Sequence, residues 1–247
     1  MKRVFEPDEP DGEEALRPSM SRRRFLQTLS AGTTLIALGG ARYALADDGA
    51  QRAAQTATRS DGRPRLPPQQ HLIERIRPMG GREGLALAGT FRLRIHGEVE
   101  QPYELDLREL LSMPQQEQSC DVHCVTKWSV FDSHWTGVRV ADLLARAKPK
   151  TSAHYAIFEA AYGYTSNVRL QEALQPNVLV AHRYEGQPLA RAHGAPVRAL
   201  VPDLYFWKSA KWLTGIRIAA RDERGFWESR GYHNHADPWK EERVGGR

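Results

Sequence analysis

The chain has 247 residues, of which 40% are hydrophobic and 26% charged, so collagen, coiled-coil and wholly disordered proteins are excluded. A chain of this length can bury a full core, and its two cysteines are too few for a disulfide scaffold or a four-cysteine zinc ribbon. The formal net charge of +5 fits an anionic ligand but is too small to indicate nucleic-acid binding.

An export signal is expected over residues 1–46. A basic run at residues 22–24 precedes a short apolar stretch, and the small-residue pattern Ala44-Leu45-Ala46 follows it. This order is typical of exported proteins, and the apolar stretch is too short for a membrane-spanning helix. The paired arginines resemble a twin-arginine signal, which bacteria use to export folded proteins. The sequence therefore predicts a mature chain that begins near Asp47 and is periplasmic or otherwise exported.

Residues 47–75 are expected to form a flexible linker. They are rich in Ala, Gln and Thr, and they contain the proline-rich run 64–68. A polar segment of this kind has no core of its own. Residues 76–247 remain, and their length suits one domain.

Short strands outnumber helices in the predicted domain. Apolar and polar residues alternate over residues 91–97, which indicates a half-buried strand. Helical spacing predicts one helix over residues 105–111, with Asp106 as its N-cap, and another over residues 138–147. Further strands are expected at residues 155–159, 178–183, 197–201 and 212–218. Because βαβ alternation is absent, the expected fold class is α+β, a β-rich mixed domain.

Both cysteines lie in a short segment that also holds His123. A disulfide is one interpretation, but Cys120 and Cys124 are only four positions apart, which demands special backbone geometry. A second is a Cys/His metal site, although a structural zinc would still lack one or two ligands. A third is a single functional thiolate at Cys124, and a fourth is two buried apolar cysteines. All four remain open from these residues alone.

A second group of candidate residues is basic. Arg198, Lys208 and Lys211 are close in sequence, with the Ser209 hydroxyl between them, and apolar residues surround them. Arginine offers a planar fork for phosphate and lysine a point charge, so the group can converge on an anion. The alternative is a solvated basic surface, and the apolar surroundings favour the pocket.

A third group lies in the tail at residues 231–239. His233 and His235 form an H-x-H pair with Asp237 nearby, which can bind a transition metal. Ordinary hydrogen bonding beside a site is the interpretation that we favour here.

Taken together, these motifs resemble the sulfite oxidase superfamily, and in particular its small bacterial molybdopterin-binding oxidoreductases. That group includes the catalytic subunit of the periplasmic methionine sulfoxide reductase system. The resemblance spans about residues 91–242 and follows the order of the family's motifs. The residues that carry it are Cys124-Val125-Thr126-Lys127-Trp128-Ser129, Trp135-Thr136-Gly137-Val138, Tyr164-Thr165-Ser166-Asn167, His193-Gly194-Ala195-Pro196-Val197-Arg198, Lys208-Ser209-Ala210-Lys211-Trp212 and the 231–239 tail.

The resemblance implies the sulfite oxidase molybdopterin-binding fold and a catalytic Cys124 that is the thiolate ligand of molybdenum. A soft thiolate suits this metal, which the dithiolene of the pterin also holds. The resemblance further implies molybdopterin contacts from His193, Arg198, Ser209, Lys211, Lys208, Asn167 and His123.

The implied reaction is a two-electron oxygen-atom transfer on a small or protein-borne oxo substrate of sulfoxide or sulfite type, in either direction. Arginines expected of a sulfite pocket are not identifiable, which argues against sulfite itself. The chain has no C-x-x-C-H haem motif, so electrons would pass to or from a separate partner such as a membrane cytochrome. No nucleic-acid partner is expected.

Two other classes of protein stay open. One is a non-enzymatic binding module that keeps the same scaffold. The other is an exported zinc-binding or hydrolytic domain that uses Cys120, His123, Cys124 and His233 or His235.

Overall fold

The computed structural model describes residues 49–80 and 90–245. The predicted export signal, residues 1–46, lies outside the described residues. From Ala50 onward the chain forms one compact unit. Within the described ranges, no helix combines the length and the apolar character that crossing a membrane requires.

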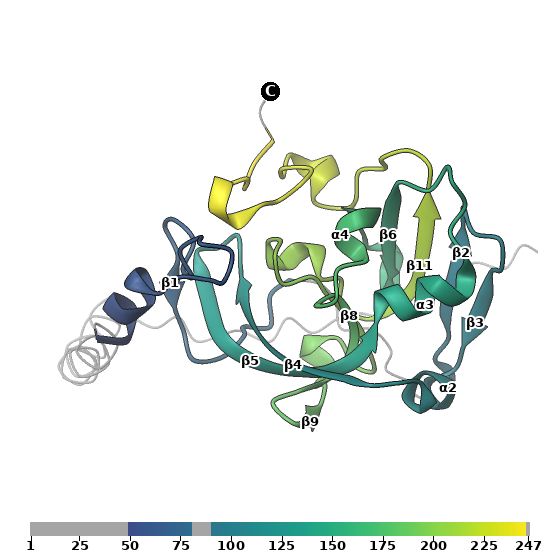
Figure 1. Cartoon of the computed structure of the whole chain (residues 1–247), viewed down its shortest axis with the longest axis horizontal. Helices are drawn as coiled ribbons and strands as arrows, with labels where there is room; N and C mark the ends of the chain where they lie inside the picture. The colour runs from purple at the N-terminus through teal and green to yellow at the C-terminus, as the bar shows by residue number, and fades with distance from the viewer. Residues whose placement is uncertain (1–48, 81–89, 246–247) are drawn as a thin grey trace, which may run out of the picture. The chain divides into compact units, whose positions relative to one another are not determined.

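Two mixed sheets form the framework of this unit (Figure 1). The first has six strands, ordered β1-β5-β8-β10 with β4 also on β5 and β9 on β8. The second has five, in the order β3-β2-β11-β6-β7. In the first sheet the strands are β1 (His71–Leu72), β4 (Gln116–His123), β5 (Trp128–Arg139), β8 (Leu179–Tyr184), β9 (Gln187–Pro188) and β10 (Arg198–Leu200). In the second they are β2 (Leu93–Gly97), β3 (Tyr103–Leu105), β6 (Tyr155–Ala160), β7 (Thr165–Arg169) and β11 (Leu213–Ala219).

The helices are short and fill the connections between strands. The α-helices in these connections are α2 (Leu107–Ser112), α3 (Val140–Ala147) and α4 (Leu170–Ala173). The 3-10 turns are η2 (Ala161–Gly163), η3 (Arg191–His193), η4 (Phe206–Lys208), η5 (Glu228–Arg230) and η6 (Pro238–Lys240). The prediction of a β-rich α+β domain is therefore confirmed.

The helix α2 begins at Leu107, directly after its predicted N-cap, whereas Leu105 of the predicted range ends β3. The Glu109 N–H donates to Asp106 Oδ1 at 2.8 Å, and the Asp106 N–H donates to Glu109 Oε2 at 2.7 Å. These two bonds form a capping box, which satisfies two backbone donors at the start of the helix. The predicted N-cap at Asp106 is thus confirmed.

The predicted helix over residues 138–147 starts two residues later than expected. Val138 and Arg139 end β5 and pair with Val180 and Leu179 of β8. Helix α3 begins at Val140 and contacts both β2 and β5, so it packs at the junction of the two sheets. Pairing with a neighbouring strand overrides the local helical spacing here.

The longest strands, β4 and β5, were not predicted. Their register shifts between Cys120 and Val122, so a bulge interrupts the alternation of buried and exposed residues. In Figure 1 the two strands run side by side as a long curved ribbon across the lower part of the view. The turn between them carries Cys124.

The segment expected as a flexible linker is an ordered arm where it is described. Residues 50–75 belong to the same compact unit as the rest of the domain. Strand β1 pairs in parallel with the start of β5, and Leu66 and Ala54 are buried. Arg65 donates to both carboxylate oxygens of Asp121 at 2.7 Å. Long-range pairing of this kind leaves no periodic signal in a polar segment. This explains why the sequence predicted a flexible linker where the structure has an ordered arm.

Candidate functional site

A tight turn between β4 and β5 holds Cys124. The Cys124 N–H donates to the carbonyl of Trp128 at 2.8 Å, and the Lys127 N–H donates to the carbonyl of Cys124 at 3.1 Å. Lys127 adopts a left-handed backbone, with φ at 72°. The Cys124 side chain is buried, and its Sγ lies 3.1 Å from the hydroxyl of Thr126. Burial raises the pKa of the thiol, while Thr126 and the charge of Arg243 oppose that rise.

The second cysteine does not join the first in a disulfide. Cys120 and Cys124 are both free thiols. Burial raises the pKa of Cys120 to about 12, so this thiol is protonated at neutral pH. In the described ranges, no three His, Cys, Asp or Glu side chains gather in a way that could hold a metal ion. The all-protein zinc site therefore finds no support in this geometry.

His123 precedes the turn and is fully buried. Its Nδ1 lies 2.8 Å from Ser129 Oγ, and its ring meets the Trp239 ring edge-on at 5.1 Å between centroids. Burial, with the charges of Arg59 and two neighbouring arginines, lowers the pKa of His123 to about 3. The imidazole is therefore neutral at physiological pH.

Arg198 carries a buried charge at the start of β10. Its guanidinium donates to the carbonyls of His193 at 3.0 Å and Ser209 at 2.8 Å, and it lies 4.2 Å from the centroid of Phe206. Its partners in the described part of the chain include no carboxylate. Burial lowers the pKa of Arg198 to about 9. A buried cation without a counter-ion is costly unless an anion joins it, so this position suits a negatively charged ligand.

A close approach at Gly194 brings Arg198 and Lys211 side by side. A β-carbon at Gly194 would lie 3.1 Å from the Cβ of Arg198 and 3.1 Å from the Cα of Lys211, and its φ is +110°. Lys211 Nζ donates to the carbonyl of Ala192 at 3.1 Å, beside His193. The structure thus brings together four predicted cofactor residues: His193, Arg198, Ser209 and Lys211.

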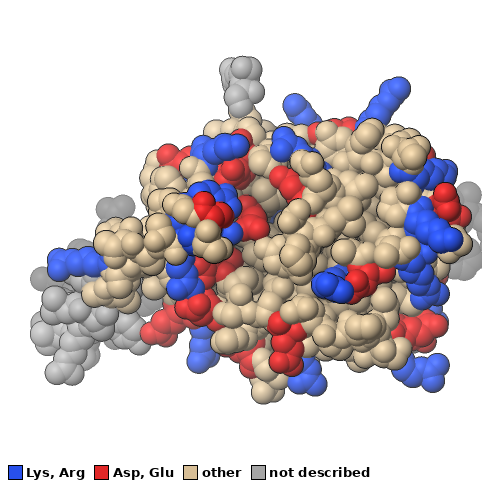
Figure 2. Space-filling view, viewed as in Figure 1, with Lys and Arg blue, Asp and Glu red and all other residues tan. Residues whose placement is uncertain are grey.

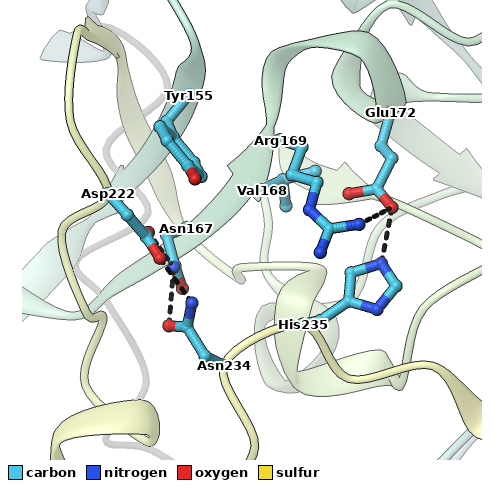
Figure 3. A pocket seen from close by; sticks show the side chains of 8 residues that line it. All are labelled: Tyr155, Asn167, Val168, Arg169, Glu172, Asp222, Asn234 and His235. Atoms are coloured by element: carbon cyan, nitrogen blue, oxygen red, sulfur yellow. Dashed lines mark hydrogen bonds and ion pairs between the residues drawn. The ribbon is translucent and has the colours of Figure 1, made fainter.

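Lys208 and Asn167, which were also predicted to bind the cofactor, form a separate cluster. Lys208 is fully buried, and its Nζ donates to Asn167 Oδ1 at 2.7 Å and to the carbonyl of Asn234 at 2.7 Å. It also forms an ion pair with Glu228 at 2.6 Å. Figure 3 shows Asn167 beside Asp222 and Asn234 at a cavity of about 60 Å³. Lys208 therefore finds its hydrogen-bond and ion-pair partners within the protein.

An open cleft of about 550 Å³ adjoins His193. It is lined by β5 from Val130 to His134, by Tyr184 at the end of β8 and by Arg75 of the arm. Val130 and Tyr184, which line the cleft, belong to the same apolar cluster as Cys124. This volume falls in the ordinary range for small-molecule and cofactor sites.

Two residues that sequence reasoning missed hold the cysteine turn. Gln70 Nε2 donates to the carbonyl of Cys124 at 3.0 Å, and Arg243 Nη1 donates to the carbonyl of Val125. They come from opposite ends of the described chain, and no local pattern in the sequence links them to the turn.

Several polar nitrogens around the turn are buried without a partner. His123 Nε2, Trp128 Nε1 and Arg243 Nε have no hydrogen-bond partner among the described residues. Buried polar atoms without a partner are rare in folded proteins, and the N–H groups of Trp128 and Arg243 indicate a missing acceptor. An acceptor-rich group bound at the turn would satisfy this requirement.

On the face shown in Figure 2, charged side chains of one sign do not gather in a separate patch. The face shown in Figure 2 carries Lys and Arg side chains mixed with Asp and Glu. Arg198, in contrast, is fully buried.

Comparisons with known proteins agree on one family. Residues 83–227 match the family model described as the oxidoreductase molybdopterin binding domain. The chain is 42% identical over 154 residues to the uncharacterized oxidoreductase YuiH of Bacillus subtilis, covering 62% of this chain and 78% of that protein. It is 33% identical over 174 residues to the protein-methionine-sulfoxide reductase catalytic subunit MsrP of Ralstonia nicotianae, covering 58% of this chain and 52% of that protein.

A solved structure shows the same fold. The sulfane dehydrogenase SoxCD from Paracoccus pantotrophus superposes with a TM-score of 0.50 at 22% sequence identity, over 54% of this chain and 39% of that chain. The expected sulfite oxidase type of fold is therefore confirmed. The chain spans about half the length of the MsrP relative that it matches.

Proposed function

The chain belongs to the oxidoreductase molybdopterin-binding domain family, and on this premise we propose that it reduces a sulfoxide-type substrate by two-electron oxygen-atom transfer. Family membership makes it a molybdopterin-dependent enzyme. The observations that carry the proposal are the buried cysteine turn, the cleft whose lining shares its apolar cluster, and the buried Arg198, which has no carboxylate partner among the described residues. The similarity to a methionine sulfoxide reductase supports both the substrate class and the reductive direction.

The residues present fit the cofactor. Cys124 offers the soft thiolate that molybdenum favours. Arg198 and Lys211, with His193 and Ser209 beside them, would hold the anionic end of the pterin. When bound, the molybdenum and its pterin dithiolene supply the two-electron chemistry.

Other predicted cofactor residues receive different tasks in this proposal. Lys208 and Asn167 bind each other and the tail, so they fix the backbone that leads into Ser209. His123 stays neutral and keeps Ser129 and the turn in place through its Nδ1 contact.

The overall reaction balances for a sulfoxide. Two electrons and two protons enter, the sulfur–oxygen bond breaks, and the thioether and water leave. The electrons come from a separate electron-transfer protein, because the chain has no haem-attachment motif. A membrane cytochrome is the kind of partner that we propose.

We further propose that the protein is exported by the twin-arginine route. The order of the basic, apolar and cleavage segments supports this, as does the requirement that a cofactor be inserted before transport. Replacement of Arg22 and Arg23 by lysine should leave active protein in the cytoplasm. Normal export of that variant would contradict the route.

An activity assay tests the proposed reaction. The protein is made in a host that synthesises molybdopterin, and methionine sulfoxide reduction is followed with a reduced viologen dye as electron donor. We expect turnover that disappears in Cys124→Ser and persists in the matched control Cys120→Ser. Equal turnover in Cys124→Ser and the wild type would refute the assignment.

A further inference from the structure

Arg243 lies where the C-terminal tail crosses the turn that carries Cys124. Its Nη1 donates to the carbonyl of Val125, the residue after the cysteine, and its Nη2 lies 3.4 Å from the carbonyl of Pro68. The guanidinium carbon is 4.9 Å from the centroid of the Tyr205 ring. One side chain of the tail thus touches the cysteine turn, the N-terminal arm and a buried aromatic ring.

The tail fixes this arginine through its own backbone. The N–H of His233 donates to the carbonyl of Arg243 at 3.2 Å, and Tyr232 forms an antiparallel bridge with Val244. The N–H of Gly245 donates to the carbonyl of Gly231 at 2.9 Å. Arg243 is therefore held in a paired segment of backbone.

Arg243 forms no ion pair with a carboxylate in the described part of the chain. Its contacts there are two carbonyl oxygens and one aromatic ring, and its buried Nε has no hydrogen-bond partner. Its neighbour Glu242 contacts His235 Nδ1 at 2.8 Å instead. The structure therefore places a positive charge directly against the cysteine turn.

We propose that Arg243 is a positioning residue that fixes the turn of Cys124 and raises the reduction potential of a metal bound to that cysteine. This inference rests on the proposed function, because it requires Cys124 to be the metal ligand. A fixed positive charge favours whichever state of its surroundings is more negative. Because each added electron makes the bound metal more negative, removal of the charge should lower the potential.

Gln70 provides the comparison that separates charge from mechanical support. Its amide holds the carbonyl of Cys124, one residue away from the carbonyl that Arg243 holds, but it carries no charge. Arg230 provides a second control, since its guanidinium also binds a backbone carbonyl and an aromatic ring, both of Phe226, at 2.8 and 3.5 Å. In the described part of the chain, Arg230 does not contact the cysteine turn.

The test is a redox titration of the molybdenum-loaded full-length protein, followed by the Mo(V) electron paramagnetic resonance signal. We expect a lower midpoint potential in Arg243→Gln and a potential near that of the wild type in Arg243→Lys. Gln70→Ala should retain less metal but keep the potential, and Arg230→Gln should change neither.

Three outcomes would overturn the inference. One is an unchanged potential in Arg243→Gln at normal molybdenum content, and another is a shift in Gln70→Ala as large as in Arg243→Gln. The third outcome applies if Arg243→Gln loads too little metal to titrate. Arg243→Lys is then titrated instead, and a clearly lowered potential in the loaded lysine variant would overturn the inference. Absence of molybdenum from the wild-type protein would contradict the proposed function itself. Metal analysis of the wild type shows this before any variant is compared.

Discussion

A buried guanidinium without a carboxylate partner is a costly feature for a folded protein. Arg198 is such a residue, because its partners among the described residues are backbone carbonyls and aromatic rings. The sequence placed Arg198 among the cofactor residues by its family motif, but it could not show the burial or the missing counter-ion. Both properties arise from the packing of β10 against Phe206, which is a tertiary contact.

Substitution of Arg198 by lysine tests the role of its planar fork. Lysine keeps the charge but loses the bidentate geometry that matches a phosphate. We expect pterin affinity to fall by about tenfold or more, which corresponds to about 1.4 kcal/mol. Pterin fluorescence of purified Arg198→Lys, relative to Arg230→Lys, measures the loss. Equal pterin content in the two variants would remove Arg198 from the cofactor site.

The ion pair of Lys208 and Glu228 allows a test of stability. Both side chains are essentially buried, and their atoms lie 2.6 Å apart. Burial lowers the pKa of Lys208, and the nearby Glu228 carboxylate counteracts this effect. Glu228→Gln leaves the ammonium without its counter-ion, so the free energy of unfolding should fall by about 3–5 kcal/mol.

An exposed ion pair supplies the control for that measurement. Glu223 pairs with Arg217 at 2.7 Å and is half exposed. Glu223→Gln should therefore change the free energy of unfolding by at most about 1 kcal/mol. Urea unfolding of the two variants measures both losses in unfolding free energy. Similar losses would show that the buried ion pair of Glu228 stabilises the protein no more than the exposed pair of Glu223.

At the scale of elements, prediction from sequence succeeded where local chemistry decides and failed where pairing decides. Asp106 and Glu109 form the capping box of α2, so the start of this helix could be predicted from the sequence. The β4–β5 hairpin has a bulge near Cys120, and most of its side chains are polar, so it carried no clear period-2 signal. For the tail at residues 231–239, the favoured prediction was ordinary hydrogen bonding beside a site. The structure shows one residue of this tail that binds two carboxylates and so anchors it to the domain.

This anchor is His235, which lies between two carboxylates. Its Nε2 is 2.6 Å from Glu172 Oε1 of α4, and its Nδ1 is 2.8 Å from Glu242 Oε2 (Figure 3 shows the Glu172 contact). Both ring nitrogens face acceptors, so the ring binds best when doubly protonated. His233 lies 3.3 Å from Glu242, and Arg169 lies 3.9 Å from Glu172. Hydrogen bonding to Glu172 outweighs burial and raises the pKa of His235.

The sign of the pH dependence follows from that direction. A raised pKa in the folded state adds stability that is fully present below the ordinary value of 6.5 and is lost as pH rises through the folded value. The difference in unfolding free energy between the wild type and His235→Gln should therefore shrink as pH rises above 6.5.

Urea unfolding across this pH range measures that difference. His123 has a lowered pKa and contributes with the opposite sign, so only the comparison of the two proteins isolates His235. His71→Gln, at an exposed position in β1, serves as the control. A difference that stays constant with pH would show that the anchor is not an ion pair.

At the scale of the whole molecule, the two ends of the described chain meet at one turn. Gln70 comes from the arm that was expected to be a linker, and Arg243 comes from the tail. The family motifs predicted the cysteine and the basic pocket, because those motifs are contiguous in sequence. The supporting residues could not be predicted, because their contacts join positions more than a hundred residues apart or lie in segments without periodicity.

Molybdenum analysis of the purified wild-type protein and Cys124→Ser decides whether Cys124 binds molybdenum. We expect near-stoichiometric molybdenum in the wild type, with a cysteine sulfur among its ligands in X-ray absorption spectra. We expect loss of that sulfur in Cys124→Ser while the circular dichroism spectrum stays the same. Absence of molybdenum from the wild type, or an unchanged sulfur coordination in Cys124→Ser, would contradict molybdenum binding by Cys124.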